Sequence, residues 1–271
     1  MNVLEYEMIE LLKKLKNEYG VFEIKAEYEN EGSRQVELMR LKDVADAAGL
    51  PLILKIGGVE AVTDIYNALS LGAKGIIAPM AETAFATSKF LNAIDTFVPE
   101  DNQKDIEFAV NIETITAYQN IDAILSLEKI GLLKSITVGR VDFAASLGAD
   151  RSFVNSDEML KYCVDIFNKA KENGLKTALG GAISVETLPF IKNLVSKNLL
   201  DKFETRKLVY HRDTVKMKNI SEGLFEGIKF ELLWLKSKRR YYHCVRDEDE
   251  KRIVMLEQRV NARSDKRQDI S

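Results

Sequence analysis

Short apolar runs with a period of two alternate with helical patterns between about residues 21 and 210. This alternation is typical of parallel strands joined by helical crossovers. Two of the clearest helical patterns cover residues 34–48, whose apolar positions fall on one stripe, and residues 158–173, which end before Gly174. Seven strands are expected, at residues 21–26, 52–56, 75–78, 106–112, 135–138, 176–179 and 207–210. The pattern therefore predicts the α/β class, with the architecture of a TIM-type (β/α) barrel.

Seven strands are one fewer than such a barrel requires. A helical pattern over residues 4–19 precedes the first strand that the sequence reveals. Either the first barrel strand is atypical or missing, or an eighth strand lies in a segment that resembles a loop, such as residues 103–106. Both alternatives place the barrel domain at residues 1–214.

The pattern changes after residue 214. Residues 215–260 are charged and strongly helical, and no glycine or proline interrupts them after Gly227. An interrupted apolar seam runs through Leu224, Ile228, Leu232, Leu235, Ile253, Leu256 and Val260. We expect a helical extension, either one long helix or a helical hairpin, which packs on the barrel or on a neighbouring subunit. Residues 261–271 are expected to form a disordered tail.

Composition restricts the class of partner. The chain of 271 residues is 46% hydrophobic and carries a net charge of −3, so no global field attracts nucleic acid or membrane. Its two cysteines, Cys163 and Cys244, lack the spacing of a zinc site and suit a reducing compartment. A basic and aromatic stretch over residues 236–243 is followed by acidic residues 247–250, which indicates a solvated helical face. We expect a cytoplasmic protein without nucleic-acid or membrane partners, since no signal peptide or membrane span is evident.

Several strands carry charged or amide side chains on the face that alternation assigns to the barrel lumen. These residues are Glu23, Lys25, Glu27, Lys55, Asn111 and Glu113, and the last strand adds Lys207 and His211. Ionised groups away from water cost several kcal/mol unless they are paired, hydrogen-bonded or metal-bound. Their number near the strand ends therefore predicts a polar active site where barrels place their chemistry. The alternative is an open antiparallel sheet with one solvated face, which would show the same pattern.

Glu113 and Asp142 follow two strands that are consecutive in the chain. Two carboxylates on adjacent strands suit a hard cation such as Mg²⁺ or Mn²⁺, which keeps open positions for substrate oxygens. These two residues are the predicted metal ligands.

Three segments carry a further signal, namely Ile112-Glu113, GRVDFAASLG at residues 139–148 and GAKGIIAPMAET at residues 72–83. At these segments the sequence resembles the HpcH/HpaI aldolase/citrate lyase family of the phosphoenolpyruvate/pyruvate barrel superfamily, and the resemblance covers residues 22–210. It implies that Glu113 and Asp142 bind the metal that chelates a 2-oxo acid.

The chain also departs from that family. Family aldolases carry an arginine where this sequence has Lys55, and a lysine lacks the planar bidentate fork of arginine. They also have a histidine base where Tyr28 stands here, and tyrosine is a poor base near neutral pH. The family's usual opening strand is missing, in agreement with the count of seven.

The resemblance and the inward charges together give each candidate residue a role. Lys55 would stabilise the substrate carboxylate or enolate, and the acid or base would be Glu27, Lys25 or Tyr28. The residues that could contact substrate are Arg140, Gly139, Pro79, Met80 and His211.

These assignments predict a metal-dependent carbon–carbon lyase or aldolase acting on a small 2-oxo acid through a pyruvate-type enolate. One alternative is a phosphoenolpyruvate-using transferase or mutase, because Lys25 and Lys55 would suit a more anionic substrate. Another is a non-catalytic barrel that binds a metabolite or acts as a scaffold. A homo-oligomer formed through the C-terminal helix is expected in each case.

Overall fold

Eight strands form a closed barrel in chain order. The protein is described by a computed structural model that covers residues 1–268, with side chains as far as Asn261. The strands are β1 (Val21–Glu27), β2 (Leu52–Lys55), β3 (Gly75–Ala78), β4 (Glu107–Ile112), β5 (Leu133–Gly139), β6 (Lys176–Gly180), β7 (Lys202–Glu204) and β8 (Leu208–His211). Strands β1 to β7 are parallel, whereas β8 runs antiparallel to both of its neighbours, β7 and β1.

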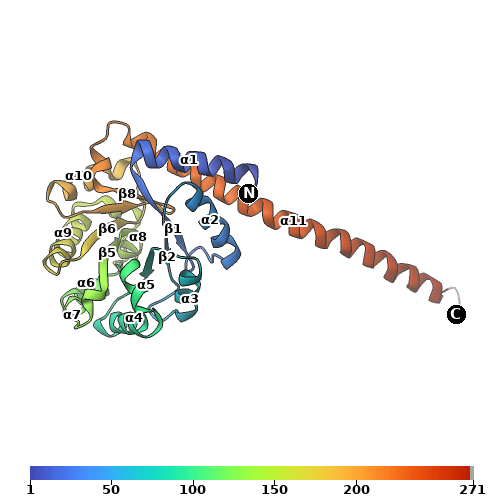
Figure 1. Ribbon diagram of the computed structural model, residues 1–271, viewed down its shortest axis with the longest axis horizontal. Helices are drawn as coiled ribbons and strands as arrows, with labels where there is room; N and C mark the ends of the chain where they lie inside the picture. Colours follow the sequence, from blue (N-terminus) through green and yellow to red (C-terminus); the bar gives the residue numbers. More distant parts are fainter. Residues whose placement is uncertain (269–271) are drawn as a thin grey trace.

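Helices surround the barrel, as Figure 1 shows. The α-helices are α1 (Val3–Tyr19), α2 (Gln35–Ala47), α3 (Val62–Ser70), α4 (Ala84–Phe97), α5 (Glu100–Asp105), α6 (Ile115–Gln119), α7 (Ile121–Leu125), α8 (Arg140–Ser146), α9 (Asp157–Glu172), α10 (Leu188–Ser196) and α11 (Ile220–Gln268). Four short 3-10 helices complete the set, namely η1 (Ile130–Leu132), η2 (Arg151–Asn155), η3 (Val185–Thr187) and η4 (Arg212–Lys216).

The predicted TIM-type barrel with a helical extension is confirmed, and the structure identifies the missing strand. No strand precedes Val21 within residues 1–268. The barrel closes instead through a hairpin, in which Phe203 of β7 pairs with Tyr210 of β8, and Ile24 of β1 pairs with Leu208. The strand that the sequence did not reveal is therefore β7. The alternative position at residues 103–106 was wrong, because residues 100–105 form α5.

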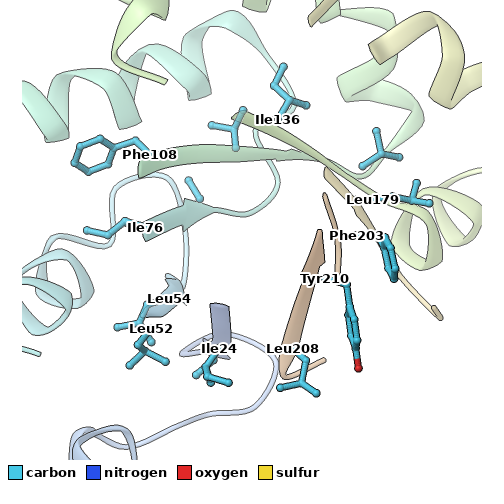
Figure 2. Close-up of a cluster of buried hydrophobic side chains, with 14 of the residues drawn as sticks. Ile24, Leu52, Leu54, Ile76, Phe108, Ile136, Leu179, Phe203, Leu208 and Tyr210 are labelled. Atoms are coloured by element: carbon cyan, nitrogen blue, oxygen red, sulfur yellow. The ribbon is translucent and has the colours of Figure 1, made fainter. Parts of the chain in front are cut away.

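Apolar side chains on the outer faces of the strands form the main core, against the helix layer (Figure 2). A smaller apolar cluster of Ile53, Ile77, Ala109 and Val209 fills the lumen. Charged residues lie on both sides of this lumen cluster. Lys202 pairs with Glu23 at 3.1 Å and with Glu107 at 3.6 Å near the amino ends of the parallel strands. The apolar lumen cluster thus separates the ion pairs at the amino ends of the strands from the polar mouth at their carboxyl ends.

Helices α1 and α11 pack against each other beside β8 and β1. Two glycines of α11 allow this close approach, since a Cβ on Gly223 would lie 2.7 Å from the Tyr19 ring and one on Gly227 would lie 2.7 Å from the Tyr210 hydroxyl. Tyr210 also donates a hydrogen bond to the carbonyl of Gly223 at 3.1 Å. The first part of α11 therefore belongs to the helix layer of the barrel.

The C-terminal extension is one helix rather than a hairpin, and Figure 1 shows it projecting far beyond the barrel. The domain boundary predicted at residue 214 lies within η4. Residues 261–268, part of the expected disordered tail, continue α11, and residues 269–271 lie outside the described residues. None of the described helices is both long enough and apolar enough to cross a membrane.

Candidate active site

A cavity opens at the carboxyl ends of the parallel strands, where the sequence predicted an active site. Its wall includes Lys25, Glu27, Lys55, Asn111, Glu113, Gly139, Asp142 and Glu204. We call this space the mouth cavity. The five side chains from β1, β2 and the end of β4 that line it are buried, which confirms that they face inward.

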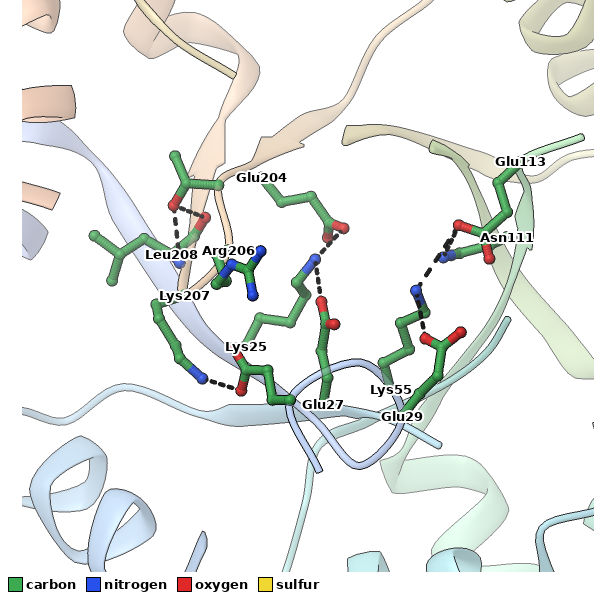
Figure 3. A network of polar contacts seen from close by, with 12 residues as sticks. Lys25, Glu27, Glu29, Lys55, Asn111, Glu113, Glu204, Arg206, Lys207 and Leu208 are labelled. Carbon is green, nitrogen blue, oxygen red and sulfur yellow. Dashed lines mark hydrogen bonds and ion pairs between the residues drawn. The ribbon is translucent and has the colours of Figure 1, made fainter. Parts of the chain in front are cut away.

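Lys25 lies between two carboxylates (Figure 3). Its Nζ is 2.6 Å from Oε1 of Glu204 and 3.4 Å from Oε1 of Glu27. Burial alone would lower the pKa of Lys25, but the two carboxylates outweigh it and raise that pKa. Burial opposes ionisation of Glu27, yet Lys25 and Lys55 hold the pKa of Glu27 below its usual value. Lys25 and Glu27 therefore carry charge near neutral pH, and Glu204 accepts a hydrogen bond from the Lys25 ammonium.

Lys55 occupies a similar position on the next strand (Figure 3). Its Nζ lies 2.8 Å from Oε2 of Glu29 and 3.8 Å from Oε2 of Glu113. Burial opposes the charge on Lys55, but Glu113, Glu29 and Glu27 outweigh it and raise its pKa to about 12. Lys55 is thus a fixed positive charge at neutral pH and cannot act there as a general base.

Glu113 follows β4 and is held by three neighbours. Its Oε1 accepts a hydrogen bond from the Met80 amide at 3.1 Å, and its Oε2 accepts one from the Asn111 side chain at 3.0 Å. The carboxylate passes over Gly139, where a Cβ would lie 2.5 Å from Oε2. Burial raises the pKa of Glu113, while Lys55 and the two hydrogen bonds oppose this rise.

Asp142 reaches the same cavity from the first turn of α8, three residues after β5. Strands β4 and β5 are parallel neighbours, with Ile112 opposite Val138. The negative charge of Asp142 adds to the effects that raise the pKa of Glu113, which reflects how near the two carboxylates are. The structure therefore brings these two acids together at the ends of adjacent strands, although Asp142 itself lies on α8.

The donor atoms at this end of the barrel suit a hard divalent cation. Besides the two carboxylates, Oδ1 of the buried Asn111 has no hydrogen-bond partner, so one more oxygen is available beside Glu113. Mg²⁺ binds in this way through one or two carboxylates and completes its shell with water and substrate oxygens. Within the described residues no group of three or more histidine, cysteine or acidic side chains is arranged to hold a metal. The arrangement thus fits an open oxygen site and not a closed protein cage.

Tyr28 is not placed to move a proton in the mouth cavity. Its hydroxyl donates a hydrogen bond to Oε1 of Gln35 at 2.7 Å, beside α2, and it does not line the cavity. Burial raises the pKa of Tyr28 further above its usual value. The structure therefore does not bring Tyr28 together with the other candidates.

Arg140 is fully buried and does not reach the mouth cavity. Its guanidinium donates to the carbonyls of Gly180, Val154 and Gly181 and to Oδ1 of Asn155, at 2.5 to 3.1 Å. Its Cζ lies 5.0 Å from the centroid of the Phe190 ring. Because the side chain is buried outside the mouth cavity and its donors are used by these oxygens, the structure gives Arg140 a structural role and does not place it for the predicted role in substrate binding. Arg140 joins the end of β5 to the loop after β6.

The remaining candidates lie at different places. Gly139 lines the mouth cavity, whereas Pro79 and Met80 do not, and the Met80 amide is already bonded to Glu113. His211 was expected near the mouth because it follows the last strand. That expectation was wrong, because β8 runs antiparallel and its end lies beside Lys202, at the opposite end of the barrel. Lys207, at the mouth end of β8, forms an ion pair with Glu31.

The sequence did not identify Glu204, Glu29, Arg151 or Arg206. Glu204 ends β7, whose three residues are Lys, Phe and Glu. This alternation of charged and apolar residues is the same as in the strands whose charged side chains face the lumen, and it is the signal that could have revealed Glu204. Arg151 and Arg206 lie on connecting segments that line the mouth cavity, where no periodicity marks them.

Several solved structures share the fold of this chain. Among solved structures, an HpcH/HpaI aldolase from Desulfitobacterium hafniense DCB-2 aligns with a TM-score of 0.58 and 15% identity over 74% of this chain and 82% of its own. The citrate synthase SbnG aligns with a TM-score of 0.60 and 18% identity over 82% of this chain and 89% of its own. A citrate lyase from Burkholderia xenovorans LB400 gives a TM-score of 0.56 and 11% identity, over 80% and 72%. At such identities these similarities show a shared fold.

No curated protein matches the chain in sequence. The model of the HpcH/HpaI aldolase/citrate lyase family, however, matches residues 36–186, which is more than half of the chain and includes Lys55, Glu113 and Asp142. The chain therefore belongs to the HpcH/HpaI aldolase/citrate lyase family and is an enzyme of the aldolase/citrate lyase type.

Proposed function

We propose that this protein is a metal-dependent carbon–carbon lyase that acts on a small 2-oxo acid through its enolate. One observation carries the proposal: the carboxylates of Glu113 and Asp142 line the same cavity, with the unpartnered Oδ1 of Asn111 beside Glu113. Oxygen donors at the mouth of a barrel suit a cation and a substrate that is itself a chelating acid.

Glu113 and Asp142 would hold Mg²⁺ or Mn²⁺. A bound divalent cation would polarise the 2-oxo group of the substrate and offset negative charge on it. The Met80 amide and the Asn111 amide hold the Glu113 carboxylate in place, so the protein itself orients this ligand.

Two cationic side chains are placed to orient the substrate carboxylate. Lys55 is held at the floor of the cavity by Glu29 and Glu113 and stays protonated at neutral pH. Arg151 lines the same cavity, and among the described residues no acidic group lies within ion-pair distance of it. A planar guanidinium can hold a carboxylate through two hydrogen bonds, which a lysine cannot do.

Glu27 is the group that we assign to proton transfer. It lines the mouth cavity, and Lys25 and Lys55 keep it ionised, so it can accept a proton from the substrate carbon. Lys25 stays charged between Glu27 and Glu204, and it therefore acts as a positioning residue and not as a base.

The formation of an enolate can be measured directly. With pyruvate and Mg²⁺ in D₂O, the enzyme should exchange the methyl protons of pyruvate for deuterium, and proton NMR follows this loss. Glu113→Gln and Asp142→Asn should weaken Mg²⁺ binding in calorimetry and abolish exchange. Glu27→Gln should retain Mg²⁺ binding and slow exchange by roughly 10²-fold or more, as expected when a general base is lost.

Glu158→Gln is a matched control, because Glu158 is an exposed acid in the first turn of α9, outside the mouth cavity. It should bind Mg²⁺ and exchange pyruvate protons as the wild type does. Unchanged Mg²⁺ affinity in both Glu113→Gln and Asp142→Asn would overturn the metal assignment.

We also propose that the enzyme works as a homo-oligomer joined through α11. The exposed apolar residues of that helix support this proposal. Their spacing also bears on which segment of the second copy they contact and in which direction it runs.

A further inference from the structure

Helix α11 carries a row of exposed apolar side chains on a face that nothing in residues 1–261 covers. The row begins with Phe225, Ile228, Leu232 and Leu235 and resumes with Ile253 and Leu256, and each of these side chains is between 44% and 64% exposed. The opposite face of the first half of α11 is buried, through Phe230, Trp234 and Ser237. The helix therefore has two apolar faces where it meets the barrel, and only one of them is covered.

Between His243 and Asn261, the part of the projecting helix whose side chains are described, α11 makes no packing contact with the barrel that could support it. From His243 to Asn261 the side chains are exposed apart from Asp247, and Figure 1 shows this part standing clear of the molecule. Most helical stability in proteins comes from packing of an apolar face, and an isolated helix is marginal in water. A partner along the row would supply that packing.

The spacing of the row is that of a coiled coil. Its members are three and four residues apart, and the same steps connect Leu235 to Ile253 through Arg239, Tyr242, Arg246 and Asp249. A strict seven-residue repeat is typical of left-handed coiled coils, in which the repeated positions face the partner helix. The seam is apolar at both ends, and its middle contains three charged residues and Tyr242, whose hydroxyl bonds Glu37 of α2.

The charged middle decides the direction of the partner. In a parallel pair of identical helices, Arg239 would face Arg239, and Asp249 would face Asp249, so like charges would meet in the seam. In an antiparallel pair with Leu232 opposite Leu256, Leu235 lies opposite Ile253 and Arg239 lies opposite Asp249. The two-fold symmetry of a homodimer repeats each of these pairs. The apolar residues at the two ends of the row then meet each other, Arg239 meets the opposite charge of Asp249, and Tyr242 lies opposite Arg246.

We propose that α11 forms an antiparallel coiled coil with α11 of a second copy of this chain, in the register that sets Leu232 opposite Leu256. This register places Val260 of the second copy beside Ile228. Phe225 and Ile228 line the mouth cavity, so the end of the partner helix borders the rim of the active site. The proposal rests on the proposed homo-oligomer joined through α11, and it does not depend on the reaction that the cavity catalyses.

Sedimentation equilibrium of the full chain tests the pairing. The wild type should be a dimer, and Leu256→Glu should raise its dissociation constant by at least about tenfold, because a charge enters an apolar seam. Val254→Glu is the matched control, since Val254 is also apolar and exposed on the projecting part but lies off the seam. Neither residue contacts the barrel, so thermal unfolding of the barrel should be the same in both variants. A wild type that stays monomeric, or equal effects of the two substitutions, would overturn the proposal.

Site-directed cross-linking tests the direction. In a Cys244→Ser background, mild oxidation of a mixture of the Leu235→Cys and Ile253→Cys variants should link one variant to the other. Neither variant alone should link to itself, and the buried Cys163 should not react. Self-linking of Leu235→Cys alone would show a parallel pair and reject the proposed register. Arg239→Asp should weaken the dimer, and Arg239→Asp combined with Asp249→Arg should restore it.

Discussion

The carboxylate of Glu113 lies directly over the main chain of Gly139, so close that a Cβ on Gly139 would be 2.5 Å from Oε2 and 2.9 Å from the Cβ of Glu113. Glu113 directly follows β4, and Gly139 ends the neighbouring β5. The backbone at Gly139 has φ near −92°, which any residue can adopt, so the glycine is required by space and not by conformation. The position of the Glu113 carboxylate, which we propose as a metal ligand, therefore depends on the absence of a side chain at Gly139 on the next strand.

We expect Gly139→Ala to displace Glu113 and to weaken Mg²⁺ binding together with catalysis. Forcing an extra methyl group into a packed site costs about 1–3 kcal/mol, so the free energy of unfolding should fall by a similar amount. Calorimetric titration with Mg²⁺ and urea denaturation measure the two effects. Gly131→Ala is the control, because no atom lies within 4 Å of a Cβ built there. An unchanged Mg²⁺ affinity in Gly139→Ala would contradict the prediction.

Lys25→Met should destabilise the protein strongly. The substitution leaves the buried carboxylates of Glu204 and Glu27 without the ammonium that now lies between them. Removing one partner of a buried ion pair costs about 3–5 kcal/mol, which urea denaturation at neutral pH would detect. Adding Glu204→Gln to Lys25→Met should recover part of the loss, because one uncompensated charge disappears. If the double variant were no more stable than the single one, the ion pair would not explain the cost.

Mg²⁺ binding should weaken on acidification at a higher pH than an exposed glutamate would predict. Burial raises the pKa of Glu113 above 4.5, and the protonated acid cannot bind a cation. Protons therefore compete with Mg²⁺ as the pH falls through that raised value, and the affinity is regained as the pH rises. Lys55 adds no alkaline loss below about pH 11, since its pKa is about 12. Calorimetric titrations between pH 4 and 8 would check this, and a midpoint at or below 4.5 would contradict it.

Arg140→Met should affect stability rather than substrate binding. The guanidinium satisfies three backbone carbonyls that would otherwise be buried without partners, so we expect a loss of about 3 kcal/mol or more. Burial lowers the pKa of Arg140 only to about 10, so the side chain remains charged at neutral pH. Urea denaturation measures the loss, and KM should stay close to the wild-type value in the folded fraction. A large rise in KM with unchanged stability would restore the role in substrate binding.

Strand alternation was sufficient to predict the polar mouth of the barrel. A period of two assigns Lys25, Glu27, Lys55 and Glu113 to one face, and parallel strands bring their ends to one rim. The sequence could not predict which charges pair. Lys25 donates a hydrogen bond to Glu204, which is 179 positions away in the sequence. A contact between such distant residues leaves no periodic pattern in the sequence around either of them.

The direction of the last strand also could not be predicted from the local pattern of apolar and polar residues. A run such as Leu208 to His211 shows a strand but not its sense, and β7 is only three residues long. For that reason His211 was assigned to the wrong end of the barrel. Arg140 was misplaced for a similar reason, because its partners, Val154 in η2 and Gly180 at the end of β6, come near it only through the fold of the chain.

Because β8 pairs with β1, the first and last strands of the barrel are neighbours in space. This pairing affects the order in which the protein can fold during synthesis. Strand β1 leaves the ribosome early, yet one of its edges is unpaired until β8 has been made. The buried face of α1, including Leu12 and Leu15, likewise waits for α11. An exposed strand edge beside an apolar helix is prone to aggregation, and contacts between distant parts of a chain form slowly. The nascent chain therefore carries this exposed surface through most of its translation, and its yield should depend on chaperones that bind unpaired strands.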